Sequence, residues 1–263
     1  PETLEAQGYH FIAADYGDLA CGWHGQGKLP DPQQIFLAAQ ALFGKQDLAG
    51  KTLLVSAGPT REEIDPVRFL SNYSSGKMGY AIAVAASHRG ARVVLVSGPV
   101  NLPEPYGVET IQVASAMEMH QAVMAEAEHA DIIIKAAAVA DFRPTTCCEQ
   151  KVKKGNSETM MVDLQRNPDI LAELGEKKGS RILIGFAAET EELLKNAREK
   201  LTKKNLDMIV ANDVTQEGAG FDVDTNIVRF LSADGSVEEL PEMSKVLVAE
   251  TLLYRVSALL SAN

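Results

Sequence analysis

The sequence predicts an α/β fold built on a doubly wound, mostly parallel sheet with helices on both faces and a C-terminal β-hairpin. Segments with strand character alternate with segments of helical periodicity from Lys51 onward. The strand segments are short, nearly continuous apolar runs such as LLV, VVLV and DIII. Such runs are what a parallel sheet covered on both faces requires.

The expected elements follow one another along residues 51–263. Strands are expected at 52–56, 91–97, 108–113, 131–136, 181–186 and 206–211. Helices are expected at 79–89, 117–128, 168–176, 189–203 and 244–260. Segments 226–231 and 236–240 flank a Ser-Ala-Asp-Gly turn and predict the hairpin. This order indicates a Rossmann-like sheet, in which ligands bind at the carboxyl ends of strands where the strand order reverses.

Residues 1–48 differ in character from the rest of the chain. Glycines and aromatic residues crowd 16–28, a short helix is expected at 33–42, and 45–50 has the composition of a linker. The sequence therefore predicts two parts, 1–48 and 49–263. Residues 142–162 have no clear period and are rich in lysine, so we expect a mobile arm there.

Composition and charge exclude several classes of protein. Lys and Arg number 25 against 36 Asp and Glu, giving a net charge of −11, which argues against nucleic acid or an anionic membrane as main partner. The cysteines, Cys21, Cys147 and Cys148, have no zinc-binding spacing. The most apolar stretches, 131–140 and 246–260, are interrupted by charges, and no signal-peptide pattern is visible, so we expect a cytoplasmic location.

The common nucleotide-binding motifs are missing from the expected strand ends. No GxGxxG follows the first strand, and the second ends in Val96-Ser97-Gly98-Pro99 without an acidic residue. Met78 follows Gly76-Lys77, where the P-loop pattern needs Ser or Thr. A nicotinamide oxidoreductase on the same fold, which is the first alternative, is therefore disfavoured.

A Ser-Ser-Gly turn instead leads into the first helix of the sheet domain. Ser74, Ser75 and Gly76 offer hydroxyl and backbone N–H groups at the positive end of the helix dipole, which is a site for an anion. The alternative is that Ser74 or Ser75 is merely an N-cap. Arg68, Asn72 and Lys77 flank the same turn and favour phosphate binding.

Other strand ends carry further candidates, each with an ordinary structural alternative. The small residues Ala136, Ala137 and Ala138 would let a ligand approach the backbone, or would serve helix–sheet packing. Phe186 would stack on a base or belong to the core, and Asn212-Asp213 would read a base edge or form an Asx turn. The lysines would bind phosphate or an oxyanion, or be solvated; they are Lys151, Lys153 and Lys154 on the arm, and Lys200 and Lys204 on one helix.

These segments together resemble a known family. AGPTREEIDPVRFLSNYSSGKMG, KAAAVADFRP, KVKK, NPDI, GFAAET and KNLDMIVANDV, in this order, closely resemble the bacterial phosphopantothenoylcysteine synthetases. These enzymes are phosphopantothenate–cysteine ligases and form one half of a bifunctional coenzyme A biosynthesis protein. The resemblance covers about residues 50–260.

The resemblance implies a two-step ligation that uses CTP and Mg²⁺. The carboxylate of 4′-phosphopantothenate would attack the α-phosphate of CTP, and the amine of L-cysteine would then displace CMP from the acyl-cytidylate. The resemblance also implies a homodimer in which the arm contributes to the partner's site, with a higher oligomer when the decarboxylase half is complete. No carboxylate pair has a spacing that identifies the magnesium ligands.

Roles carry over to the residues that match the motifs. The resemblance implies that Asn72 binds the acyl intermediate, that Arg68 helps to position it, and that Lys151 stabilises charge during acyl transfer. The residues it implies for the CTP site are Ala137, Ala138, Asp141, Pro168, Asp169, Ile170, Leu171, Phe186, Lys200 and Lys204, and Ala136 precedes them on the same strand end.

Residues 17–28 resemble the substrate flap of the flavin-dependent decarboxylase half. In that family the cysteine matching Cys21 is the proton donor, but the segment that binds FMN and carries the catalytic histidine has no counterpart in this sequence. We therefore expect no decarboxylase activity from this chain alone. A remaining alternative is a non-catalytic chain that only holds an assembly together.

Overall fold

The computed structural model describes residues 2–153, 158–189, 191–213, 215, 216, 218 and 220–262. Its centre is a sheet of eight strands in the order β15-β14-β12-β11-β8-β3-β6-β7. The strands are β3 (Thr52–Ala57), β6 (Arg92–Ser97), β7 (Glu109–Gln112), β8 (Ile132–Lys135), β11 (Ile182–Glu189), β12 (Met208–Asp213), β14 (Val228–Ser232) and β15 (Val237–Glu239).

Six of these strands are parallel, and the C-terminal hairpin β14–β15 adds an antiparallel edge beside β12. Numbered along the chain, the parallel strands lie in the order 3-2-1-4-5-6, which is the order of a Rossmann sheet. The predicted fold class is therefore confirmed. The strand order reverses between β3 and β8, so this point of the sheet is where a ligand is expected.

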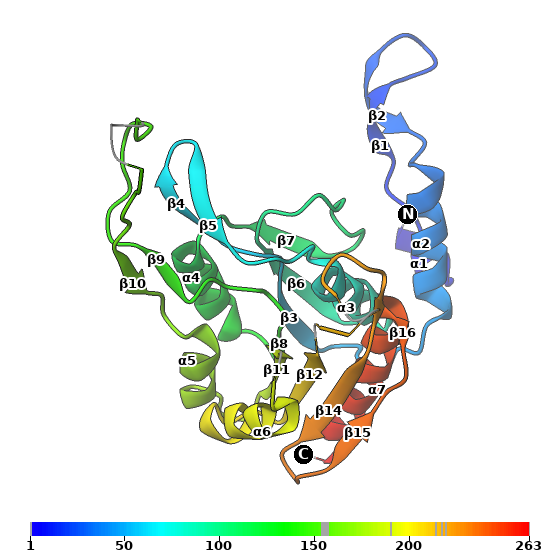
Figure 1. Ribbon diagram of the computed structural model, residues 1–263. Coiled ribbons are helices and arrows are strands. Elements are labelled where there is room, and N and C mark those ends of the chain that lie inside the picture. Colours follow the sequence, from blue (N-terminus) through cyan, green and yellow to red (C-terminus); the bar gives the residue numbers. More distant parts are fainter. Residues whose placement is uncertain are drawn as a thin grey trace.

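Helices cover both faces of the sheet (Figure 1). Residues of α3 (Lys77–His88) and α7 (Lys245–Ala262) share one buried apolar cluster with one face of the strands. Residues of α4 (Ala116–Ala127), α5 (Ile170–Glu176) and α6 (Leu193–Lys203) share a second cluster with the opposite face. On β3 the alternation is direct, since Leu53 and Val55 belong to the first cluster and Leu54 to the second.

Gly79 allows α3 to approach β3 closely. A Cβ added at Gly79 would lie 2.5 Å from the Cβ and 3.1 Å from the Cα of Ala57. We expect Gly79→Ala to lower the free energy of unfolding by about 1–3 kcal/mol, as overpacked sites do, although alanine favours a helix. Urea denaturation checks this. Gly25→Ala, whose added Cβ meets only Leu19 at 4.0 Å, is the matched control and should change little.

Four short strand pairs were not predicted. One is β13 (Thr225–Asn226) with β16 (Met243–Ser244). The other three are the hairpin of β1 (Asp15–Asp18) and β2 (His24–Lys28), the hairpin of β4 (Arg61–Asp65) and β5 (Arg68–Ser71), and the pair β9 (Phe142–Pro144) and β10 (Leu164–Arg166). The last pair closes the base of the predicted arm, so the prediction of irregular structure was wrong at residues 142–144. Figure 1 shows β4–β5 beside this arm. All of these strands are short and lack the apolar runs that revealed the central sheet.

The segment 45–50, predicted as a linker, is packed against the sheet domain. Leu48 is fully buried in the cluster that contains α3 and α7. Asp47 forms an ion pair with the buried Arg89, and the pKa of Asp47 is held below its usual value mainly by this hydrogen bond. Before it come α1 (Glu2–Glu5) and α2 (Pro32–Phe43), and β1–β2 projects away from the central sheet (Figure 1). No helix among the described residues is long and apolar enough to cross a bilayer.

Candidate active site

A cleft of about 760 Å³ lies at the carboxyl ends of β8, β11 and β12, beside the start of α3, the helix between β3 and β6, and so at the reversal of strand order. Most of the predicted site residues line it. The lining includes residues 72–79, 135–142, 166–171 and 186–188, with Lys200, Lys204, Asn212, Gly220, Phe221, Asn226 and Lys245. The structure thus brings together the Ser-Ser-Gly turn, the Ala136–Ala138 strand end, Asp141, the NPDI segment, Phe186 and the two lysines of α6.

Neither Ser74 nor Ser75 is the N-cap of α3, so the structure does not support that alternative. Gly76 is the N-cap, with a left-handed φ of 76°, and no side chain caps the helix. Ser75 instead donates its hydroxyl to the carbonyl of Phe221, and Ser74 accepts a 3.4 Å bond from the backbone N–H of Gly76. The positive end of the α3 dipole therefore faces the cleft without a side-chain cap, as suits an anion site.

Lys77 and Lys245 fix the segment 220–224 beside this helix start. The Lys77 ammonium donates to the carbonyl of Asp222 and pairs with Asp224, each at 2.7 Å, and this contact lowers the pKa of Asp224. The buried Lys245 ammonium donates to the carbonyls of Gly220, Phe221 and Val223. Burial lowers the pKa of Lys245. Both ammonium groups are thus bonded within the protein, and Lys77 was predicted to bind a ligand whereas Lys245 was not.

Hydrogen bonds to the backbone position the segment that follows β8. The N–H of Ala138 donates to the carbonyl of Gly58 at 2.9 Å, and the N–H of Ala140 donates to the buried Thr60 hydroxyl at 3.0 Å. The side-chain amide of Asn72 donates to the carbonyl of Val139 at 3.1 Å. These bonds orient Asn72 in the cleft, while its side-chain oxygen has no partner among the described residues.

The NPDI segment is tied to the same strand end. The Asn167 amide donates to the carbonyl of Ala140 at 2.8 Å and accepts from the Arg143 guanidinium at 2.8 Å. Asp169 caps α5 by accepting from the N–H of Ala172, and it pairs with Lys204 at 2.9 Å. This local structure explains why the predicted helix 168–176 begins only at Ile170.

Lys135 is a site residue that the sequence reasoning missed. It ends β8 and lines the cleft, and its side-chain ammonium has no hydrogen bond or ion pair to any part of the chain that the structure describes. Burial first, and then the nearby Lys204, lower the pKa of Lys135 to about 8, although Asp169 and Asp141 oppose this shift. The sequence signal that could have identified Lys135 is its position directly after the apolar run of three isoleucines in DIIIK. A buried strand rarely ends in an unpaired ammonium.

Five described candidates do not line the cleft. Arg68 lies in the β4–β5 hairpin, Lys151 and Lys153 are exposed on the arm, Cys21 is exposed in the β1–β2 hairpin, and Asp213 ends β12. Lys154 lies outside the described residues. No group of three or more His, Cys, Asp or Glu side chains arranged to bind a metal is present in the described parts of the chain.

A comparison with known protein families shows to which of them the chain is related. A family model described as the DNA/pantothenate metabolism flavoprotein C-terminal domain matches residues 48–260. The chain belongs to this family. The chain is also 51% identical over 261 residues to the coenzyme A biosynthesis bifunctional protein CoaBC of Bacillus subtilis (strain 168). The match covers 98% of this chain but 64% of that relative.

Solved structures agree with the family assignment. The crystal structure of the C-terminal domain of a CoaBC protein is 45% identical, with a TM-score of 0.72, and the match covers 83% of this chain and all of that one. A Cab2 mutant (H337A) in complex with phosphopantothenate-cysteine is 17% identical with a TM-score of 0.64, which shows a likeness of fold. The family thus confirms the resemblance inferred from the ordered motifs.

Proposed function

We propose that this chain is a CTP-dependent ligase that joins 4′-phosphopantothenate to L-cysteine. The observation that carries the proposal is the cleft at the reversal of strand order, where an uncapped helix N-terminus, a backbone-lined strand end and several lysines converge. Family membership and the names of the CoaBC relatives support the place of the reaction in coenzyme A biosynthesis.

The reaction has two steps. A carboxylate oxygen of 4′-phosphopantothenate bonds to the α-phosphorus of CTP, and pyrophosphate leaves with the electrons of the broken P–O bond. The amine of cysteine then attacks the acyl carbon, CMP leaves, and the amine loses a proton to solvent. Because both substrates are anionic, the site has to neutralise charge while it holds them in line.

The residues of the cleft suit these tasks. Lys135, Lys200 and Lys204 supply positive charge, and the N-terminus of α3 supplies N–H groups for a phosphate. Asn72 is oriented by its bond to Val139, which leaves its side-chain oxygen for the acyl intermediate. Phe186, together with the NPDI segment, lines the part of the cleft that we assign to CTP.

The cleft also fits a magnesium ion bound with the nucleotide. Mg²⁺ is commonly held by one or two carboxylates together with substrate phosphates. Asp141 lines the cleft, is exposed, and has no side-chain partner within the described residues, whereas Asp169 is paired with Lys204. Asp141 would therefore hold the ion, which when bound neutralises phosphate charge.

We place Lys151 in the site of a second copy of the chain. Lys151 lies outside the lining of its own cleft, and the family resemblance implies a homodimer in which the arm contributes to the partner's site. In that arrangement the ammonium would stabilise the negative charge that develops during acyl transfer.

Pyrophosphate release tests the proposal. We expect release from CTP with 4′-phosphopantothenate, and amide formation only when cysteine is added. Release with ATP alone would keep the ligase but overturn the choice of nucleotide. No release with either nucleotide from a folded dimer would contradict the proposal and favour a scaffold, whereas stabilisation by NADPH in a thermal shift assay would favour the oxidoreductase alternative.

A further inference from the structure

Asp65 has a buried carboxylate beside the arm. It does not line the cleft, and the family resemblance assigns it no role. It ends β4 at the turn of the β4–β5 hairpin, and its side chain is 0% exposed. One oxygen accepts from the backbone N–H groups of Val67 and Arg68, each at 2.9 Å. The other accepts from the Arg68 guanidinium and, at 3.1 Å, from the N–H of Val152.

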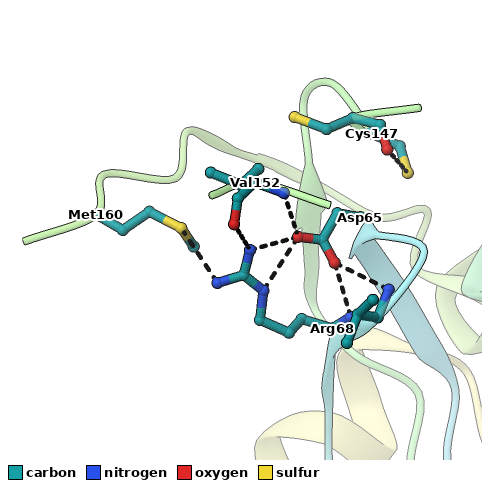
Figure 2. Close-up of polar contacts among 7 residues, drawn as sticks. Asp65, Arg68, Cys147, Val152 and Met160 are labelled. Atoms are coloured by element: carbon teal, nitrogen blue, oxygen red, sulfur yellow. Dashed lines mark hydrogen bonds and ion pairs between the residues drawn. The ribbon is translucent and has the colours of Figure 1, made fainter. Parts of the chain in front are cut away.

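The contacts of Val152 join the hairpin to the arm (Figure 2). Its N–H donates to Asp65, and its carbonyl accepts from Arg68 at 2.9 Å, so both of its backbone groups bond to the same ion pair. The guanidinium also reaches the sulfur of Met160 at 3.9 Å, on the far side of the arm. A second link joins the N–H of Cys148 to the carbonyl of Ile64 at 3.0 Å.

The ion pair keeps its charge over the whole range in which the protein would be assayed. The Arg68 guanidinium first, and then the N–H groups of Val67 and Val152, hold the pKa of Asp65 well below its usual range. Val152 directly follows Lys151, so its two backbone hydrogen bonds to the Asp65–Arg68 pair attach the arm to the hairpin next to Lys151.

We infer that Asp65 is a positioning residue that fixes the backbone of the arm next to Lys151, through Val152 and Arg68, and so sets where the Lys151 ammonium can act. The inference rests on the proposed ligase activity. Asp65 does not line the cleft, so its removal should affect the step that needs Lys151 and leave nucleotide binding unaffected.

Asp65→Asn tests this in the full chain. The amide keeps the shape of the side chain but loses the charge, and it cannot accept from all the donors that surround the carboxylate. We expect kcat to fall about 10- to 100-fold while KM for CTP and for 4′-phosphopantothenate changes less than about twofold. We also expect trypsin to cleave after Lys151 and Lys153 at least about fivefold faster, because the arm has lost its anchor.

Glu63→Gln is the matched control and should change neither measurement, because Glu63 is exposed on the same hairpin and its carboxylate has no hydrogen bond or ion pair among the described residues. Unchanged cleavage in Asp65→Asn would overturn the inference, and so would faster cleavage with unchanged kcat. A rise in KM for CTP without faster cleavage would also overturn it, since Asp65 would then act on the nucleotide. Because proteolysis needs no substrate, an inactive wild-type chain would defeat the proposed function, while unchanged cleavage would still defeat the anchor.

Discussion

Replacing Lys151 by glutamine is expected to lower the rate of amide formation by about 100-fold or more while the protein remains folded. A positioned charge that stabilises a developing negative charge commonly contributes 10²–10³ in rate. Lys151 is exposed, and its side chain forms no hydrogen bond or ion pair with the part of the chain that the structure describes, so its loss should not change the free energy of unfolding. Single-turnover measurement of product from preformed acyl-cytidylate isolates the affected step.

Lys153 provides the matched control for this experiment. It lies on the same arm, carries the same charge and is also exposed. Lys153→Gln should retain most of the activity if the position of Lys151 matters, because both variants lose one positive charge. Equal losses in the two variants would instead indicate that the arm contributes only its overall charge, and the role assigned to Lys151 would fail.

Lys135→Met is expected to weaken CTP binding about 10- to 100-fold at pH 7. Charge-assisted hydrogen bonds contribute about 1.5–3 kcal/mol, and each 1.4 kcal/mol is a factor of about ten in affinity. The Lys135 ammonium has no partner among the described residues and lines the cleft, so an anionic ligand would satisfy it. Isothermal titration with CTP and with pyrophosphate measures the effect directly.

The same lysine predicts how nucleotide affinity changes with pH. Since its pKa is lowered to about 8, Lys135 is mostly protonated at pH 7 and mostly neutral at pH 9. The wild-type affinity for CTP should therefore fall as pH rises through 8, and the affinity of Lys135→Met should stay flat over that window. A parallel decline in both proteins would contradict the assignment.

The free energy of unfolding of the wild type should rise with pH over the window in which its affinity for CTP falls. A half-buried lysine with a lowered pKa costs folding free energy when both the folded and the unfolded states are protonated, and this cost is relieved as pH rises from about 8 toward the usual pKa of lysine. Lys135→Met should therefore be as stable as the wild type at pH 7, or more so. Lys203→Met, on the exposed face of α6, is the control and should alter neither affinity nor its pH dependence.

The parts of the fold that could be predicted are those with a strong local pattern. The apolar runs identified the strands of the parallel sheet, and the Ser-Ser-Gly turn, the alanine strand end and the NPDI segment are among the segments that line the cleft. The positions of these segments at neighbouring strand ends follow from the reversal of strand order. The sequence therefore placed most of the cleft, including Asn72, Asp141 and Lys204.

The parts that were missed depend on contacts between distant segments. Asp65 and Val152 are 87 residues apart, and only the fold of the β4–β5 hairpin brings them together. Leu48 looked like part of a linker because its burial is supplied by α3 and α7. Lys245 belongs to the last helix, yet it is linked to the start of α3. Its ammonium donates to the carbonyls of Gly220 and Phe221, and Phe221 also accepts from Ser75. No local pattern encodes such pairings.

The three carbonyls that surround the Lys245 ammonium resemble the oxygen cage that many proteins fill with a potassium or sodium ion. Here the cation is covalently part of the chain, so it is always present at full occupancy and cannot be exchanged with the medium. The contact between α7 and segment 220–223, part of which lines the cleft, therefore needs no cation from the solution.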